Sequence, residues 1–226
     1  MKPTTEQFFS FQELFNFFNV KLFDDKLPNV ILNFSRQAGS AGFFAPNHWK
    51  RSDGHKTHEI SINPNTFSAG KDYIISTLVH EMCHLWQESF GKPGAKGYHN
   101  REWADKMIEV GLIPSDTGLE GGKQLGTRMS DYIDEEGRLR DLLNVLPKDL
   151  WLPFETIEIL SYEQLLDMVN MEDDPTKLEE LNNQLEELET AKKKLKLKYS
   201  CPDCGVNVWG KVGLNILCGD CNCEFI

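Results

Sequence analysis

Residues 72–91 read DYIISTLVHEMCHLWQESFG, and this stretch organises the first half of the chain. We expect a helix over residues 73–89, with Asp72 as its N-cap and with Gly91 and Pro93 at its end. The helix is strongly apolar along most of its length, through Ile74, Ile75, Leu78, Val79, Met82, Leu85 and Trp86. Polar side chains in its middle would be costly to bury without a shared partner.

The middle of this helix reads His80-Glu81-Met82-Cys83-His84. Residues four apart lie on the same face of a helix, so His80 and His84 can present two ring nitrogens to one metal ion. Zinc suits imidazole ligands, and a catalytic zinc site keeps one position open to water beside its three protein ligands. Glu81 follows the first histidine, where a general base for that water belongs. The segment therefore predicts a catalytic zinc site with Glu81 as its catalytic residue.

The third zinc ligand must come from another part of the chain. The metzincin pattern would place Gly at 87 and His at 90, and the chain has Gln87 and Phe90, so that class is excluded. Two candidates remain, Glu102 on the following predicted helix and His99 just before it. We favour His99, because the Gly-rich stretch 91–97 lets the chain turn back toward the first two ligands.

The flanking segments predict a mixed α+β domain around this helix. An N-terminal helix with one buried face is indicated by the spacing of Phe8, Phe11, Phe15, Phe18 and Leu22. The expected strands are residues 30–34, 41–44, 59–63 and the short pair Tyr132-Ile133. Residues 47–58 are polar and are expected to form a loop. A further helix is expected at 101–110, with Asn100 as N-cap and Gly111 at its end.

The acidic charge of the chain is concentrated in its middle. The net charge is −11, and residues 115–190 carry 20 acidic and 6 basic side chains. This balance argues against indiscriminate nucleic-acid binding, although it allows a local basic contact. An a/d pattern covers two heptads, too few for a coiled coil, at Leu178, Leu181, Leu185 and Leu188. We therefore expect residues 136–198 to form an acidic, mainly helical spacer.

No membrane association is expected from the sequence. The chain has no run of about 18 apolar residues, the length needed to span a bilayer as a helix. The Phe-rich N-terminal stretch lacks the basic start, apolar block and cleavage site of a secretory signal. The sequence therefore predicts a cytoplasmic protein.

Five of the six cysteines lie between residues 201 and 223. Cys201 and Cys204 form one Cys-x-x-Cys unit, and Cys218 and Cys221 form a second. Without an export signal, such pairs indicate metal binding rather than disulfides. Four thiolates close a tetrahedral structural zinc site, and residues 199–226 have too little core to fold without one. Cys223 could replace Cys221, but the spacing favours Cys221.

A basic run precedes the cysteine unit, formed by Lys192, Lys193, Lys194, Lys196 and Lys198. One interpretation is the solvated end of an acidic helix, where lysines interact favourably with the helix dipole. The other is a strip of phosphate contacts at Lys192–Lys198, beside Trp209, which could stack on a base of DNA. The sequence leaves both interpretations open.

His80-Glu81-x-x-His84, followed by Tyr98-His99-Asn100-Arg101-Glu102-Trp103, resembles the SprT-like (Spartan-type) metalloprotease domain. In that family an HExxH helix is followed, after a spacing like that from His84 to His99, by a third histidine and then an aromatic residue. Trp103 stands at the aromatic position, and the stretch Leu27-Pro28 is also similar. Asn100 departs from the pattern, because many relatives have glycine there.

The resemblance covers about residues 8–114, with a further similar stretch at 121–133, and implies a zincin-like SprT-like metalloprotease domain, a zinc endopeptidase with an open cleft. The expected domains are therefore the SprT-like domain at residues 1–135, the spacer at 136–198 and the four-cysteine zinc ribbon at 199–226. We expect two zinc ions, one catalytic and one structural. Family members are associated with cutting proteins that are bound or crosslinked to DNA. By the general zincin pattern, the strand at Ile60–Asn63 would edge the cleft and pair with a protein substrate.

The alternative function comes from another class of protein. The chain could be a non-catalytic adaptor that binds nucleic acid or protein, with two structural zinc sites. An intact Glu81 favours the enzyme, because a scaffold has no use for a general base at that position.

Overall fold

The computed structural model describes residues 1–148, 150–156, 162–171, 174–194 and 196–226. The chain folds into two compact units, Met1–Glu158 and Ile159–Ile226. The helices of the first unit are α1 (Pro3–Phe23), α2 (Lys71–Phe90), α3 (Arg101–Val110) and α4 (Arg138–Val145). Its strands are β1 (Ile31–Phe34), β2 (Gly42–Lys50), β3 (Lys56–Ile62), β4 (Leu112–Ser115) and β5 (Ser130–Ile133). The second unit contains α5 (Tyr162–Met171), α6 (Pro175–Lys194), β6 (Lys196–Ser200) and β7 (Asn207–Lys211).

Helix α1 confirms the amphipathic pattern of the N-terminal stretch except at Phe8, which is 38% exposed. Its buried side chains are Phe11, Leu14, Phe15, Phe18, Asn19, Leu22 and Phe23. On the same helix Phe9 points to solvent and is 56% exposed. The helix ends at Asp24, which adopts a left-handed conformation with φ 56°. The periodic phenylalanines therefore attach this helix to the core.

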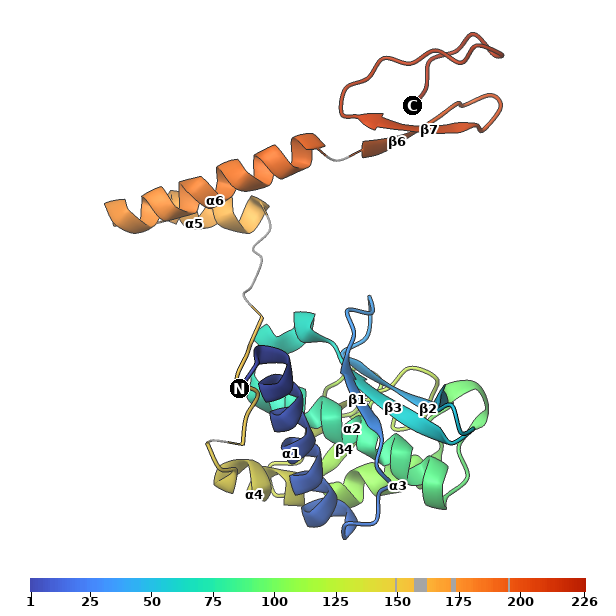
Figure 1. Cartoon of the computed structure of the whole chain (residues 1–226), viewed down its shortest axis with the longest axis vertical. Coiled ribbons are helices and arrows are strands. Elements are labelled where there is room, and N and C mark those ends of the chain that lie inside the picture. The colour runs from blue at the N-terminus through green and yellow to red at the C-terminus, as the bar shows by residue number, and fades with distance from the viewer. Residues whose placement is uncertain (149, 157–161, 172–173, 195) are drawn as a thin grey trace. The chain divides into compact units, whose positions relative to one another are not determined.

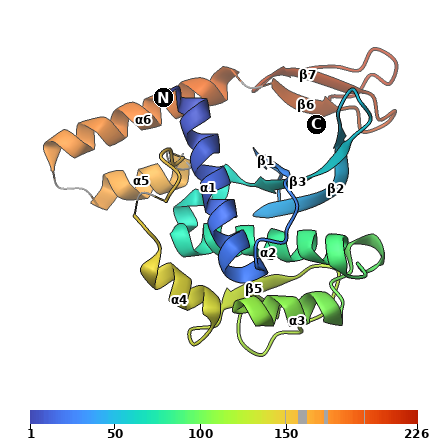
Figure 2. The same ribbon diagram turned by 60° about the horizontal axis from the view of Figure 1, so that its bottom comes forward.

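A small mixed sheet lies on one side of α2 and carries the strand order β1-β3-β2. Strand β3 pairs in parallel with β1 and antiparallel with β2, so it is the central strand. Ile60 and Ile62 of β3 are almost fully buried and belong to the core cluster that also contains α1 and α2. Figures 1 and 2 show α2 between this sheet and α3.

The central position of β3 corrects an expectation about the cleft. The prediction that Ile60–Asn63 edges the cleft and pairs with substrate is wrong, because β3 has a hydrogen-bonded neighbour on both sides and its residues do not line the cleft. The free edge beside α2 belongs to β2. Sequence patterns report which residues alternate in burial, but they do not report the order of strands in a sheet.

The polar loop expected at residues 47–58 is instead a β-hairpin. Strand β2 continues to Lys50 and β3 begins at Lys56, with Trp49 opposite Thr57 in the register. The turn is closed by a hydrogen bond of 2.8 Å from the Arg51 N–H to the His55 carbonyl. Most of these residues are exposed, so the apolar alternation used to recognise strands is missing.

The start of α2 also differs from the expectation. Gly70 is its N-cap, with φ 95°, and the helix begins at Lys71, so the prediction that Asp72 caps it is wrong. The Asp72 carboxylate lies in the first turn and pairs with Arg140 at 2.8 Å. An acidic residue in the first turn stabilises a helix through the helix dipole, so Asp72 marks the helix start without being its N-cap.

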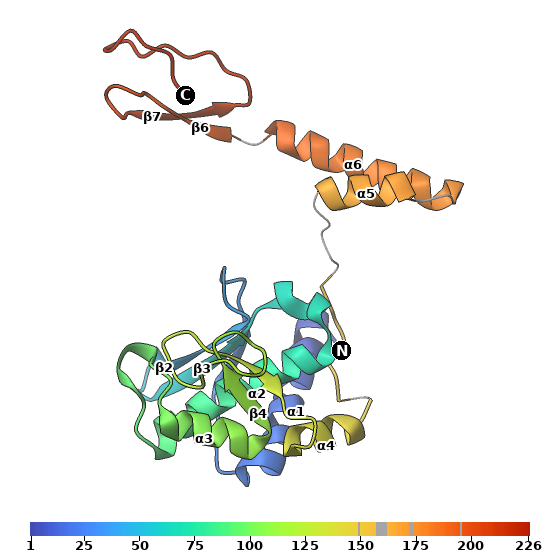
Figure 3. The same ribbon diagram turned by 180° about the vertical axis from the view of Figure 1, so that it is seen from behind.

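Helix α3 begins and ends as the sequence predicts. The Asn100 side chain accepts a hydrogen bond from the Trp103 N–H, and Gly111 closes the helix in a left-handed conformation with φ 96°. The next residues form β4, a strand that the sequence pattern does not predict, and it pairs antiparallel with β5. This pairing brings the segment 130–133 back to α2, and Figure 3 shows the partner strand β4 beside α2 from behind.

Part of the predicted spacer packs on the first unit. Leu139 of α4 and Leu152 are buried in the same core cluster as α2. In the second unit α5 packs along α6, with Leu165 and Leu181 buried. No helix among the described residues has the length and hydropathy needed to cross a membrane.

We predict that Phe18→Ala lowers the free energy of unfolding by about 3–5 kcal/mol, because it removes a large, fully buried side chain. Phe9→Ala on the same helix is the matched control and should change stability by less than about 0.5 kcal/mol. Urea denaturation followed by circular dichroism measures both. Equal destabilisation by the two substitutions would contradict the orientation of α1.

Candidate metal centre

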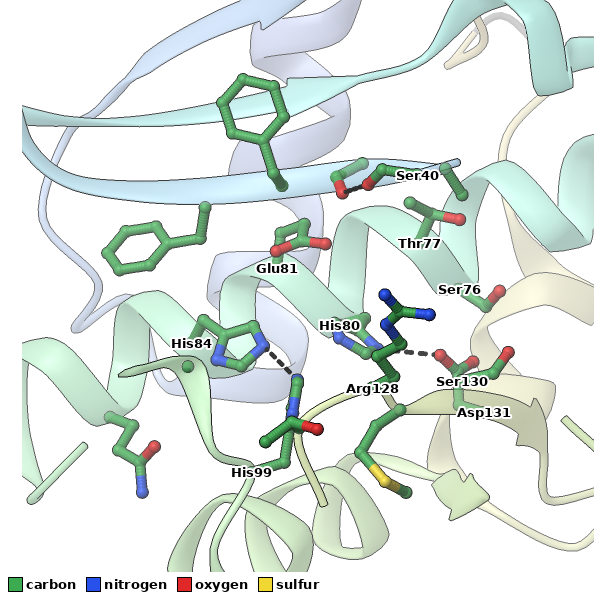
Figure 4. A pocket seen from close by; sticks show the side chains of 18 of the residues that line it. Ser40, Ser76, Thr77, His80, Glu81, His84, His99, Arg128, Ser130 and Asp131 are labelled. Carbon is green, nitrogen blue, oxygen red and sulfur yellow. Dashed lines mark hydrogen bonds and ion pairs between the residues drawn. The ribbon is translucent and has the colours of Figure 1, made fainter. Parts of the chain in front are cut away.

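Three histidines from two parts of the chain meet beside α2. His80 and His84 lie one turn apart on α2, and His99 lies directly before α3. Each offers a ring nitrogen, and the three nitrogens lie within 4.8 Å of one another. Figure 4 shows the three rings directed toward a common region at the base of a cleft. The structure therefore brings together the three residues that the sequence singled out as ligands.

His80 is held by a carboxylate from a distant strand. Its Nδ1 lies 2.9 Å from an Asp131 oxygen, and both side chains are only about a tenth exposed. Since a carboxylate accepts, the Nδ1 proton is donated to Asp131, which leaves Nε2 as the nitrogen that can bind a metal. Asp131 lies on β5, and no local motif marks it in the sequence.

His99 is held by the main chain. Its Nδ1 lies 3.0 Å from the Gly126 carbonyl oxygen, which can only accept a hydrogen bond. The backbones of the two residues also form an antiparallel bridge, with the His99 N–H donating to the same carbonyl at 2.8 Å. Nε2 of His99 is thereby the free nitrogen, and it lies 3.1 Å from Nε2 of His84.

The loop before α3 is fixed by a polar network that includes the alternative ligand Glu102. The Gln87 amide donates to Asn100 at 2.7 Å and to Glu102 at 2.8 Å. Glu102 also accepts the Lys92 N–H at 2.6 Å, and the Asn100 amide donates to the Lys92 carbonyl at 2.9 Å. Glu102 thus holds the loop and is not part of the histidine group, and Asn100 closes the turn.

Trp103 forms the apolar side of the histidine group. Its fully buried indole lies 5.2 Å from the His84 ring in a stacked arrangement, and 5.0 Å and 4.4 Å from the rings of His80 and His99. Burial lowers the pKa of His99 to about 4 and holds the pKa of His84 well below its usual range. Both rings are therefore neutral near pH 7, which is the state that can bind a metal.

Glu81 lies beside the histidines without belonging to their group. It is 6% exposed, and Figure 4 shows it on the β2 side of α2. Burial raises the pKa of Glu81 to about 7, against a smaller lowering effect from the His80 charge and the Phe44 backbone. A carboxyl group in this state can exchange a proton near neutral pH.

An open cleft of about 980 Å³ runs over the histidines and Glu81. One wall includes residues 38–44, which lead into and form the start of edge strand β2. A second wall comes from residues 127–131, before and at the start of β5. Arg128, Met129 and Ser130 in this second wall are further site residues that sequence reasoning missed.

The four cysteines of the predicted ribbon form a second group. Cys201, Cys204, Cys218 and Cys221 each offer a sulfur, and the four sulfurs lie within 4.8 Å of one another. The Cys204 N–H lies 3.4 Å from the Cys201 sulfur and lowers the pKa of Cys201 to about 6. Cys223 lies outside the four, although its sulfur is 3.4 Å from that of Cys201.

Comparison with known families agrees with this geometry. Residues 11–120 match the family model of the SprT-like family. The chain therefore contains an SprT-like domain. No curated protein matches the chain. The matched interval of the SprT-like domain contains all three histidines, whereas Gly126 and Asp131, which hold two of them, lie just beyond it.

The donor chemistry of the SprT-like domain fits a zinc ion. The Nδ1 atoms of His80 and His99 are committed to Asp131 and Gly126, so their Nε2 atoms are the ones available to a metal, and the His84 Nε2 lies 3.1 Å from that of His99. Three imidazole donors without a fourth protein ligand are the usual set of a catalytic zinc site, and four thiolates are that of a structural site. The described part of the chain therefore contains two groups that could each hold a metal ion.

We predict that Asp131→Ala weakens zinc binding at the histidine group about 10- to 100-fold, because the His80 ring loses the acceptor that orients it. Competition against a chromophoric chelator measures the affinity, starting from a wild-type chain expected to bind two zinc ions. Asp105→Asn, at an exposed position of α3, is the control and should change nothing. Unchanged affinity in Asp131→Ala would contradict the orienting role.

Proposed function

We propose that the chain is a zinc-dependent endopeptidase that cleaves proteins in the cleft of its SprT-like domain. The observation that carries this proposal is that a group of three histidines and a separate glutamate lie side by side in the cleft. Three histidine nitrogens converge at the base of the cleft, and Glu81 lies beside them as a buried carboxyl group outside their set. A purely structural site would be closed by a fourth protein ligand, and the histidine group has three ligands among the residues that the structure describes.

His80, His84 and His99 would hold the zinc ion. When bound, zinc supplies a Lewis acid that polarises a peptide carbonyl and makes water acidic near neutral pH. Glu81 accepts the proton of the attacking water and passes it to the leaving amine, which its raised pKa of about 7 favours. Asp131 and Gly126 orient two of the rings throughout.

The edge strand β2 offers a backbone for the substrate. Only its β3 side is paired in the sheet, and its first residues, Gly42, Phe43 and Phe44, line the cleft above Glu81. An extended peptide can add to such an edge through main-chain hydrogen bonds, which do not depend on the side chains of the peptide. We propose that the substrate pairs antiparallel with β2.

We further propose that the ribbon contacts DNA and brings the enzyme to proteins bound or crosslinked to it. The β6–β7 register places Lys198 opposite Trp209 and Lys196 opposite Lys211, so these four side chains share one face of the hairpin. Trp209 is 62% exposed. An exposed indole among lysines suits a single strand, since the base stacks while the lysines contact phosphates. The side chains of Lys192, Lys193 and Lys194 lie outside the described residues.

We predict that Glu81→Gln lowers casein hydrolysis about 100- to 10,000-fold, because the amide cannot accept the proton of water. Metal analysis should find the same zinc content as in the wild type, since Glu81 is not a ligand. Glu88→Gln, on the same helix and also lining the cleft, is the matched control and should stay active. Hydrolysis retained by Glu81→Gln would sink the mechanism, as would activity that survives a chelator.

We predict that Trp209→Ala weakens single-stranded DNA binding by about 1–3 kcal/mol, the usual contribution of one base stacked on an aromatic ring. Lys198→Gln should lower the slope of log affinity against log salt by about 0.7, the share of one phosphate contact. Fluorescence anisotropy with a labelled oligonucleotide measures both, with Lys50→Gln in the first unit as control. DNA binding that survives deletion of residues 192–226 would remove the idea.

A further inference from the structure

The walls of the cleft contain an uneven set of charges. The acidic residues among the described lining are Glu81, Glu88, Asp116 and Asp131. Arg128 is the one lysine or arginine in that lining. Figure 4 shows its side chain directed from the second wall toward α2, into the space above the His80 ring.

The nearby acids are already engaged by other groups. Asp131 accepts from His80 at 2.9 Å, and Asp116 accepts from the Lys123 N–H at 2.9 Å. Within the described part of the chain, the Arg128 guanidinium makes no hydrogen bond or ion pair. A guanidinium always carries its charge, and its planar fork matches the two oxygens of a carboxylate. Arg128 is thus an available anion-binding group in the cleft.

Two uncharged polar residues of α2, Ser76 and Thr77, lie at the end of the cleft that Arg128 faces. The Ser76 and Thr77 hydroxyls both donate to the Tyr73 carbonyl, at 2.9 Å and 2.8 Å, and so stay on their own helix. Ser130 completes this end of the cleft. None of these groups repels an incoming carboxylate, and their hydroxyl oxygens do not neutralise the guanidinium.

The direction of β2 decides which part of a substrate meets Arg128. A side-chain carbon at Gly42 would lie 2.8 Å from Thr77, whereas the Phe44 ring stacks on His84 at 6.5 Å. Strand β2 therefore passes from the Thr77 end of the cleft toward the His84 end. A peptide that pairs antiparallel with β2 runs the opposite way, so its residues after the cleaved bond reach the end with Ser76, Ser130 and Arg128.

We propose that Arg128 selects substrates that carry a carboxylate on the C-terminal side of the cleaved bond. This inference rests on the peptidase function and on the antiparallel pairing proposed above. The carboxylate can be an aspartate or glutamate side chain, or the free C-terminus of a short peptide. In either case Arg128 is a specificity-determining residue that touches the substrate away from the reacting atoms.

The test is cleavage of a peptide library, with the cut sites read by mass spectrometry. The zinc-loaded wild-type chain should enrich Asp and Glu after the cut about fivefold, the effect of one exposed ion pair of about 1 kcal/mol. Arg128→Gln should lose this enrichment. Arg128→Glu should instead enrich Lys and Arg after the cut. Lys123→Gln, which changes a neighbouring cation outside the cleft lining, should keep the wild-type profile.

The profile also separates the two sources of the carboxylate. Cuts clustered near peptide C-termini in free-acid libraries, and absent in amidated ones, assign the main-chain carboxylate. Enrichment of Asp and Glu in both libraries assigns the side chain. An unchanged profile in Arg128→Gln overturns the proposal. So does a uniform loss of kcat in that variant with the preference kept, which would indicate a role at the reacting carbonyl.

Binding provides an arm that does not depend on catalysis. In the zinc-loaded Glu81→Gln chain, amidated fluorescein-labelled decapeptides with a single Glu should bind about fivefold more tightly than the same peptides with Gln. Adding Arg128→Gln should abolish that difference. If no peptide is cut by the wild type but the difference persists, the peptidase function fails and the Arg128 site stands. If peptides are cut but show no preference for a carboxylate, the peptidase function stands and the Arg128 proposal fails.

Discussion

Two imidazoles and a carboxyl group in the middle of an apolar helix impose the constraint on which the first unit depends. Their polar atoms lose water on folding, and each needs a partner in the protein or a shared cation. The structure supplies Asp131 for one ring of the histidine group and the Gly126 carbonyl for another, from a segment far along the chain. The β4–β5 pair, the turn before α3 and the position of Trp103 can all be understood as supports for this one buried group.

The parts of the fold that could be predicted are those encoded by neighbouring residues. Phe11, Phe15 and Phe18 repeat at helical spacing, Asn100 and Gly111 delimit α3, and the Cys-x-x-Cys units each fit a single turn. In each case the interacting atoms lie within a few residues of one another. The resemblance based on His80, His84 and His99 also holds, over residues 11–120.

The parts that could not be predicted depend on contacts between distant segments. Asp131 reaches His80 only because β4 and β5 pair, and the order β1-β3-β2 follows from packing on α2 rather than from any one strand. The hairpin at residues 47–58 escapes prediction for another reason. Its backbone pairs as in any sheet, but solvent on both faces removes the alternation of apolar side chains. Asp72 is misleading because first-turn and N-cap positions favour the same residue type.

The rings of His80 and His99 are both held by groups outside α2, but the two supports differ in how easily a mutation removes them. His80 relies on a side chain, so one codon change at Asp131 removes its support. His99 relies on a carbonyl oxygen that every residue type possesses, and a side-chain carbon at position 126 would meet only the Met129 sulfur at 3.3 Å and the Arg128 carbonyl at 4.0 Å. Substitutions at position 126 therefore leave the hydrogen bond of His99 in place, whereas substitutions at position 131 remove that of His80. Variation among natural chains of this architecture should be tolerated at 126 and penalised at 131.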